Sequence, residues 1–254
     1  MGRLSVALVL IATLARAELP PQAFGDMRNV RVSIHDAYAW YRFDGNLADS
    51  GSQALNLTAS GITTNSGYIT FDTSGAQRWA KSVETNYLAG ATNFTLSFWA
   101  KASDANANWL YMWQQTNSTA SSAYRGGPES QWRPDVAANR VLLVMYEQAG
   151  SGASVFTWTN ITIIATTWTH YAFAWGSPSH SNAYCWINGE SNRLASSSIF
   201  AGATNVPTNS RLFIGNSESG SAGRIYRGSQ GRWRVYSRVI TDYEARQLFL
   251  EGSP

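Results

Sequence analysis

Three aromatic side chains, Trp109, Tyr111 and Trp113, alternate along one short segment of the chain. Successive side chains of a β-strand point to opposite faces, so these three would line one face of a strand. The residues between them, Leu110 and Met112, make the other face apolar as well. One face can pack in a core, and the other must then meet a covering loop, a partner or a ligand.

A long polar connection over residues 116–139 follows, and it carries Tyr124, Arg125, Trp132 and Arg133 among small polar residues. Aromatic rings stack on the apolar faces of sugars, and arginine bonds hydroxyl groups, but the same side chains suit a protein interface. Long loops on a rigid scaffold are where binding function normally resides. We therefore predict a ligand-binding platform made of Trp109, Tyr111, Trp113, Tyr124, Arg125, Trp132 and Arg133. The alternative is that the loop folds back and buries its own tryptophans.

Catalytic chemistry has little support in the sequence. A hydrolytic triad needs a histidine beside a nucleophile and a carboxylate, and only His35, His170 and His180 are available. We interpret His170, within an alternating apolar segment, as structural. Gly-x-Ser-x-Gly, His-Glu-x-x-His, a cysteine pair for zinc and a phosphate-binding loop are all absent from the sequence. We predict a protein that is not an enzyme, with unrecognised catalytic chemistry as a weaker alternative.

The amino-acid composition excludes several other classes of protein. The chain has 254 residues, a formal net charge of +3, 14% charged residues and a single cysteine. Without Arg3 and Arg16, which lie in a segment that we expect to be removed, 17 basic and 16 acidic residues leave +1. A net charge this small does not indicate the basic surface that a nucleic-acid partner requires. One cysteine, Cys185, excludes an intramolecular disulfide, and we expect its side chain to be buried.

The first residues resemble a targeting segment rather than part of a fold. Arg3 precedes an apolar run of about eleven residues, and Ala15-Arg16-Ala17 supplies the small residues of a cleavage site. The run is shorter than the ~20 residues that span a bilayer, and we expect no membrane span. We predict a signal peptide over residues 1–17, a leader or linker over 18–35 and one domain over 36–252. The alternative is an ordinary apolar N-terminal strand in a protein that is never exported.

The positioning elements are predicted to be β-strands. Apolar and aromatic residues alternate with a period of two in short runs, separated by turn residues such as Asp44-Gly45 and Asn188-Gly189. Thr241 and Glu244 have capping-box spacing and predict one short C-terminal helix. Ten or more short strands with one helix indicate an all-β fold, a jelly-roll β-sandwich of two antiparallel sheets.

Four stretches together resemble the laminin-G-like branch of the concanavalin A-like lectin/glucanase superfamily. They are spread over roughly residues 37–250 in the order that the family shows. The stretches are Tyr41–Gly51, Phe94–Lys101, Trp168–Phe173 with Tyr184–Gly189, and Leu212–Gly215 with Arg234–Glu244. The resemblance implies a concanavalin A-like sandwich and a lectin-like, non-catalytic role.

The resemblance also implies that calcium could bind near the opening acidic turn, with Asp49, and less so Asp44, as ligands. The acidic stretch that relatives place before the closing strand is replaced here by Gln230-Gly231-Arg232, which puts that site in doubt. The alternative for Asp49 is an Asx-type turn residue that bonds its own backbone. Glucanases on this fold use two glutamates in Glu-x-Asp-x-x-Glu spacing, and this sequence has no such spacing.

These observations predict a secreted, non-catalytic adhesion module that binds a glycan or a cell-surface polymer. Self-association or contact with other surface proteins is a further option. The main alternative is a structural or assembly protein of a coat, a surface layer or a virus particle built on the same fold. A fold can carry unrelated functions, so the lectin-like role must be argued from the site.

Overall fold

The computed structural model describes residues 35–71, 78–84, 86–103, 110–117, 127–133, 140–146, 153–159, 161, 166–176, 182–198, 206–215 and 226–254. The segment predicted as a signal peptide, 1–17, lies outside the described residues, and so does the leader except for His35. Within the described part, the period-two alternation has produced β-strands that pair in antiparallel fashion into two sheets.

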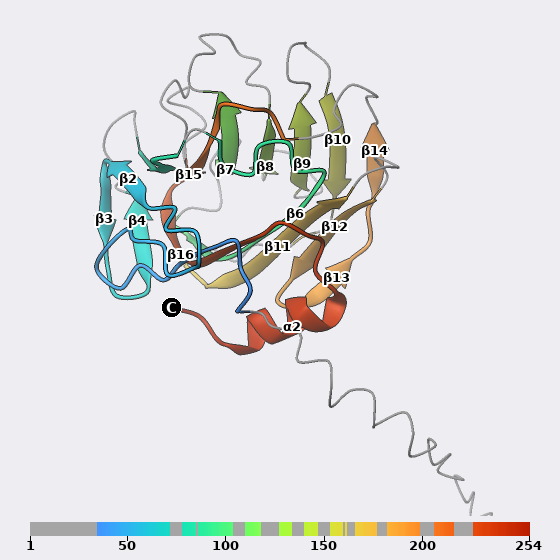
Figure 1. The fold of residues 1–254 in the computed structure, drawn as a ribbon. Helices are drawn as coiled ribbons and strands as arrows, with labels where there is room; N and C mark the ends of the chain where they lie inside the picture. Colours follow the sequence, from blue (N-terminus) through green and yellow to red (C-terminus); the bar gives the residue numbers. More distant parts are fainter. Residues whose placement is uncertain are drawn as a thin grey trace, which may run out of the picture. The chain divides into compact units, whose positions relative to one another are not determined.

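The first sheet has eight described strands, which include the first and the last strand of the described chain, β1 (Ala39–Tyr41) and β16 (Gly228–Tyr236) (Figure 1). In spatial order, its strands are β13 (Glu190–Asn192), β12 (Asn182–Ile187), β11 (Thr169–Gly176), β6 (Asn93–Ala102), β16 (Gly228–Tyr236), β4 (Tyr68–Phe71) and β3 (Ile62–Thr64), with β1 (Ala39–Tyr41) also paired to β16. Neighbours in the sheet are often far apart in the sequence, as β6 and β16 are. This long-range order is typical of a jelly roll.

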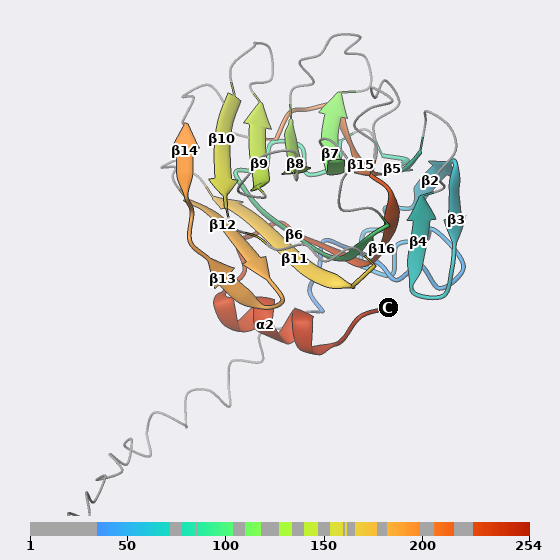
Figure 2. The same cartoon turned by 180° about the vertical axis from the view of Figure 1, so that it is seen from behind.

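The second sheet also has eight described strands. In order, they are β14 (Ser196–Ser198), β10 (Ala153–Trp158), β9 (Arg140–Tyr146), β8 (Pro128–Arg133), β7 (Leu110–Asn117), β15 (Ser210–Gly215), β5 (Trp79–Ser82) and β2 (Leu57–Ser60). Figures 1 and 2 show β7, β8, β9 and β10 side by side in one layer, with β6, β11 and β12 in the other. The described residues therefore form a jelly-roll β-sandwich, as the sequence predicts.

The inner faces of the two sheets share an aromatic core. On β11, Tyr171, Phe173 and Trp175 point into it, as their alternation predicts, and all three are buried. Trp233 of β16 lies over Phe98 of β6 with ring centroids 4.2 Å apart and planes 5° apart. Each buried aromatic side chain of this size removes about 150–250 Å² from water, so this core is the main source of stability.

The outer face of the first sheet is covered by α2 (Asp242–Leu250), the one helix that the described residues contain. The helix lies on the side of the sheet turned away from the second sheet (Figures 1 and 2). Beneath it, Ala172 and Ala174 are fully buried and pack with Leu248. Small side chains at these positions allow the helix to approach the strand closely, which explains the alternation of large and small residues on β11.

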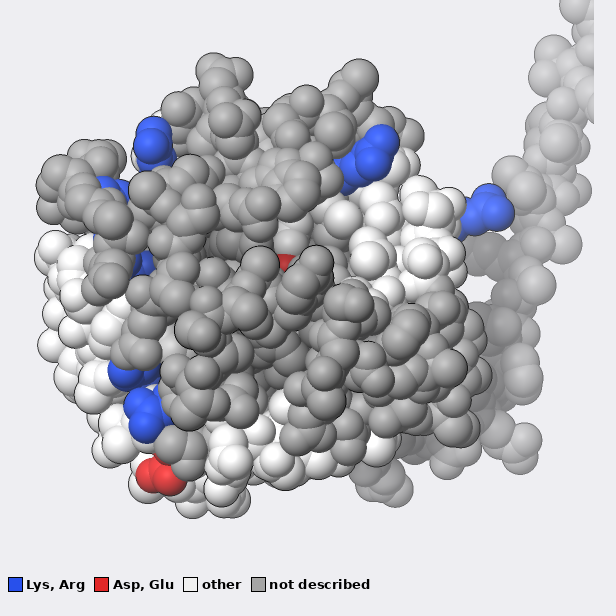
Figure 3. All heavy atoms as spheres, turned by 90° about the horizontal axis from the view of Figure 1, so that it is seen from above, with Lys and Arg blue, Asp and Glu red and all other residues white. Residues whose placement is uncertain are grey.

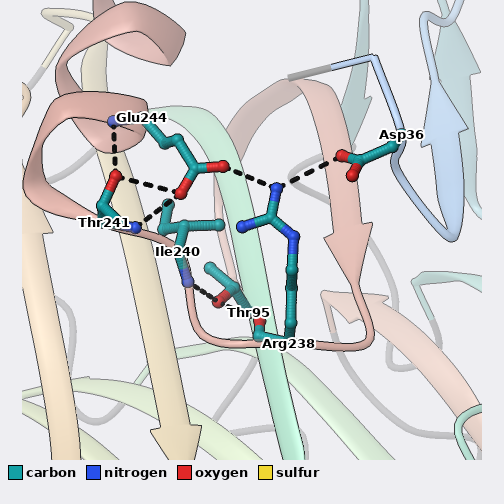
Figure 4. Close-up of polar contacts among 6 residues, drawn as sticks. All are labelled: Asp36, Thr95, Arg238, Ile240, Thr241 and Glu244. Atoms are coloured by element: carbon teal, nitrogen blue, oxygen red, sulfur yellow. Dashed lines mark hydrogen bonds and ion pairs between the residues drawn. The ribbon is translucent and has the colours of Figure 1, made fainter. Parts of the chain in front are cut away.

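The start of α2 is fixed by a polar network (Figure 4). Thr241 is the N-cap: its Oγ1 accepts a hydrogen bond from the Glu244 amide at 3.2 Å, and the Glu244 carboxylate accepts one from the Thr241 amide at 2.7 Å. Arg238 forms an ion pair with Glu244 at 2.5 Å and with Asp36 at 3.2 Å. Burial alone would raise the pKa of Glu244, but the hydrogen bonds from Arg238 and Thr241 outweigh it and lower that pKa. The predicted capping box is confirmed.

Two local predictions can be compared directly with the backbone. The Asn188-Gly189 turn between β12 and β13 is confirmed, and both residues have positive φ, of 52° and 77°, as a tight hairpin requires. The predicted long polar connection is interrupted by a strand, β8. This strand has Pro128 at its first position and three polar residues in a row, Glu129, Ser130 and Gln131, so it lacks the apolar alternation that marks a strand in a sequence.

Cys185 on β12 is buried and free, and burial raises the pKa of its thiol. Among the described residues, no helix combines the length and the apolar character needed to cross a membrane.

Candidate functional site

The predicted binding platform falls partly within the described residues. Trp109, Tyr124 and Arg125 lie outside them, and the structure describes only the backbone of Tyr111, Trp132 and Arg133. That backbone places Tyr111 on β7 and the other two on β8.

The predicted aromatic strand segment is thereby paired with a segment of the predicted loop in one sheet. Leu110 of β7 lies opposite Trp132 of β8, and Tyr111 lies opposite Gln131. The fold thus brings the start of β7 and the end of β8 to the same end of the second sheet.

Trp113 is corrected from a platform residue to a core residue. It is fully buried and packs edge-on against Phe94, with ring centroids 6.2 Å apart. The cause is a β-bulge between Tyr111 and Trp113, which adds one residue to β7 and breaks the alternation. Met112, the extra residue, is buried in the same core.

A row of polar side chains lies next to these positions. Gln114 of β7 pairs across the sheet with Glu129 of β8, and both are buried, as is Gln131. The Gln131 amide donates a hydrogen bond to the Glu129 carboxylate. Their cross-strand partners on β9, Val144 and Leu142, are buried but do not belong to the core between the sheets, so the row is on the outer face of the second sheet.

The sequence analysis did not predict this polar row, because Glu129 is not part of a catalytic glutamate spacing. The signal is present in the spacing: Glu129 and Gln131 alternate with Ser130, and alternate residues of a strand share a face. The row supplies a carboxylate and amide groups, the kinds of group that bond sugar hydroxyl groups, but its three side chains are at most 5% exposed.

The opening acidic turn is built around Asp49. Its Oδ1 accepts hydrogen bonds from the amides of Trp40 and Gly51, both at 2.7 Å, and its Oδ2 accepts one from the amide of Leu55 at 2.9 Å. The bond to Gly51, two residues on, is an Asx turn, the alternative that the sequence left open. This carboxylate fixes the turn to β1 and uses both of its oxygens to do so.

Asp44, the second calcium candidate, lies at the surface and forms an ion pair with Arg42 at 3.1 Å. Across the described part of the chain, no cluster of three or more His, Cys, Asp or Glu side chains could hold a metal ion. A hard cation such as calcium wants six to eight oxygen ligands, and the residues around Asp44 and Asp49 do not fit it.

His170 contacts a serine but is not arranged for hydrolysis. Its Nε2 lies 2.9 Å from Ser97 Oγ, and both residues are buried beneath α2, where Phe249 and Trp99 flank the imidazole ring. Its Nδ1 has no hydrogen-bond partner among the described residues, whereas a triad places a carboxylate there. Burial, with a smaller contribution from the charge on Arg234, lowers the pKa of His170 to about 3, so the ring is neutral.

The charged side chains of the described residues are dispersed over the face seen in Figure 3. Lysine and arginine atoms show at separate places around its margin, and acidic atoms show in its middle and at its lower edge. This distribution agrees with the low net charge of the sequence.

Comparison with solved structures shows similar sandwiches at low sequence identity. The binding domain of botulinum neurotoxin serotype D has a TM-score of 0.63 and 13% identity, and it aligns with 86% of this chain and 53% of its own. The ligand binding domain of that serotype, solved in complex with N-acetylneuraminic acid, has a TM-score of 0.61 and 12% identity. The alignment covers 85% of this chain and 51% of that domain. The binding domain of botulinum neurotoxin DC, solved with rat synaptotagmin II, has a TM-score of 0.62 and 12% identity. The alignment covers 86% of this chain and 52% of that domain.

The chain spans about half the length of these solved structures, and identities this low establish the fold alone. Among curated proteins, none matches the sequence. A family model, Laminin_G_3, described as Concanavalin A-like lectin/glucanases superfamily, matches residues 64–246. Because this match covers more than half of the chain and the sandwich agrees with it, the protein belongs to the concanavalin A-like lectin/glucanases superfamily.

Proposed function

We propose that this protein is a non-catalytic, lectin-like adhesion module that works outside the cell and binds a glycan or another surface polymer. The observation that carries the proposal is the pairing of β7 with β8. It puts Tyr111 opposite Gln131, and Arg133 two residues further along β8, in register with the buried polar row of Gln114, Glu129 and Gln131 on the outer face of the second sheet. Trp132 alternates with these positions and pairs with the core residue Val141, so the register assigns it to the inner face. Aromatic residues next to amide and carboxylate groups are the usual components of a sugar site.

The solved neighbours support a binding role. One neurotoxin domain was solved with N-acetylneuraminic acid and another with rat synaptotagmin II, so sandwiches of this shape occur in proteins that bind sugars and surface proteins. We extend the platform to Trp109, Tyr124 and Arg125 from their place in the sequence. Calcium is not required in this proposal, because the carboxylate of Asp49 is already bonded to three amides.

A Tyr111→Ala variant tests the platform. On a broad glycan array, the full chain should bind a defined subset of glycans, and the variant should lose about ten-fold or more in affinity, as truncation of an aromatic hot spot does. Tyr243→Ala is the matched control, because Tyr243 is 58% exposed on α2, on the other sheet. Unchanged glycan binding by Tyr111→Ala would contradict the platform.

Secretion is part of the proposal and has its own test. We propose that residues 1–17 are a signal peptide, 18–35 a leader and 36–252 the binding domain. Protein recovered from the medium of a secreting host should begin at Glu18. Retention of Met1 by the exported or cellular protein would contradict this assignment.

One observation favours the alternative of a structural or assembly protein. Tyr243 and Leu250 lie about two turns apart on α2, and they are 58% and 61% exposed. Exposed apolar side chains on one helix face suit contact with another copy. If the chain assembles through α2, Tyr243→Ala should lower its sedimentation coefficient, whereas Tyr111→Ala should not.

A further inference from the structure

A second concave site lies on the first sheet, away from the β7–β8 platform. It is a cleft with a volume of about 480 Å³, within the range of small-ligand sites. Side chains from β1, from the turn that follows it, from β16 and from the end of α2 line this cleft. They include Trp40, Arg42, Asp44, Arg232, Arg234 and Glu251.

Pairing between β1 and β16 determines which side chains face the cleft. Tyr41 lies opposite Trp233, and both point into the core between the sheets. Trp40 lies opposite Arg234, so these two side chains share the outer face. The Arg234 guanidinium lies over the Trp40 ring, 4.5 Å from its centroid.

A β-bulge in β16 brings a further arginine to the same face. Gln230 points inward, since its amide bonds the Met112 carbonyl at 3.1 Å, and strict alternation would then turn Trp233 outward. The bulge between Gly231 and Arg234 adds one residue and reverses that alternation. Arg232, within the bulge, has a φ of 47°, in the left-handed region that is strained for a non-glycine residue. Such strain often accompanies a functional site.

The charges of the cleft do not cancel. Arg234 pairs with Glu251 at 2.6 Å, and Arg42 pairs with Asp44 at 3.1 Å. Arg232 instead donates to two backbone carbonyls, those of Glu251 and Gly252, at 2.6 and 2.9 Å. Among the described arginine and acidic side chains that line the cleft, three guanidinium groups therefore face two carboxylates, and Arg232 bonds backbone carbonyls rather than an acidic side chain.

We propose that this cleft binds a sugar unit that carries one carboxylate. The unbalanced guanidinium charge attracts one negative group, and arginine recognises a carboxylate through paired hydrogen bonds. The carboxylates of Asp44 and Glu251 can accept hydrogen bonds from hydroxyl groups, and they repel a phosphate or another multiply charged anion. Trp40, which is half-buried, supplies apolar surface for the ring of the sugar.

The test uses two ligands that differ at a single carbon. Methyl α-D-galacturonide carries a carboxylate at C6, and methyl α-D-galactoside carries a CH₂OH group there. In NMR titrations of the full chain at pH 7 and low salt, the galacturonide should bind about ten-fold more tightly than the galactoside. Equal affinity for the two sugars would overturn the proposal, and so would tighter binding of inorganic phosphate than of the galacturonide.

Two variants at the margin of the cleft should change the affinity for the galacturonide in opposite directions. Arg42→Gln should weaken galacturonide binding about five-fold, and Asp44→Asn should strengthen it about two-fold, because they remove charges of opposite sign. Both side chains are about half exposed, at 54% and 53%, so the variants should fold. Arg246→Gln is the matched control, since this exposed arginine on α2 pairs with Glu190 and does not line the cleft. Wild-type affinity in Arg42→Gln, or equal losses in Arg42→Gln and Arg246→Gln, would refute the site.

The proposed cleft can be tested independently of the proposed platform. Tyr111→Ala should leave galacturonide binding unchanged, and Arg42→Gln should leave the platform's glycan binding unchanged. Failure of the cleft therefore leaves the β7–β8 proposal intact, and the reverse also holds.

Discussion

The two faces of the first sheet obtain their stability in different ways. On the inner face, the indole N–H of Trp233 has no hydrogen-bond partner among the described residues, and neither has that of Trp113, which packs into the same core from the second sheet. These side chains act through apolar area alone. On the outer face, the indole N–H of Trp186 donates to Asp242 of α2 at 2.6 Å. A sandwich core can thus tolerate tryptophan as a purely apolar residue, whereas the layer beneath the helix combines packing with polar contacts.

This comparison predicts that stability depends most on the inner face. Trp233→Ala should lower the free energy of unfolding by about 3–5 kcal/mol, because it removes the ring stacked on Phe98 and leaves a cavity. Trp233→Phe keeps much of the stacking area and should cost clearly less. Urea unfolding of the two variants measures the difference, and equal losses would show that the stacked ring is not what the core depends on.

A group on the outer face, His170, should make the protein less stable in acid. His170 is neutral in the folded protein with a pKa near 3, against about 6.5 when unfolded. A lowered folded pKa means that the unfolded state takes up the proton first. Stability should therefore be full above pH 6.5 and should fall as the pH drops toward 3, by roughly 2–3 kcal/mol at pH 4.5.

Urea midpoints measured between pH 7.5 and 4.5 test this expectation. His170→Gln removes the titrating group and should flatten the slope in this window, whatever its effect on absolute stability. Glu244 has a lowered pKa and also loses its stabilising contribution on acidification, but only as the pH falls below its unfolded pKa of about 4.5. An unchanged slope between pH 6.5 and 5 in the variant would contradict the role given to His170.

The helix start should have a smaller effect than either of these. Thr241→Ala removes the hydroxyl that accepts from the Glu244 amide, and it should cost about 1 kcal/mol. Thr241→Ser retains the hydroxyl and is the control. Thermal unfolding followed by circular dichroism should rank wild type and Thr241→Ser above Thr241→Ala, and a Ser variant as unstable as the Ala variant would argue against the cap.

The smallest effect is expected at the exposed surface of α2. Arg246 and Glu190 are 3.5 Å apart and mostly exposed, so Arg246→Gln should change stability by less than about 0.5 kcal/mol. A loss as large as that of Thr241→Ala would show that the outer face depends on surface charge more than the comparison allows.

Features set by local sequence were accessible before the structure. The alternation of Tyr171, Phe173 and Trp175 with alanines, the Asn188-Gly189 turn and the Thr241–Glu244 capping box each depend on residues a few positions apart. The candidate sites were less accessible. The sequence shows the aromatic residues of the platform, but it assigns Trp113 to the wrong role and gives no sign of the cleft.

The sequence by itself therefore determined the all-β class, the family and the short helix near the C-terminus. Only the tertiary structure decided which face each residue occupies on β7 and β16. In both strands a bulge reverses the alternation, and a bulge exists only relative to a partner strand that is distant in the sequence. The same long-range pairing brings Trp40 beside Arg234, so the cleft depends on contacts that local patterns cannot encode.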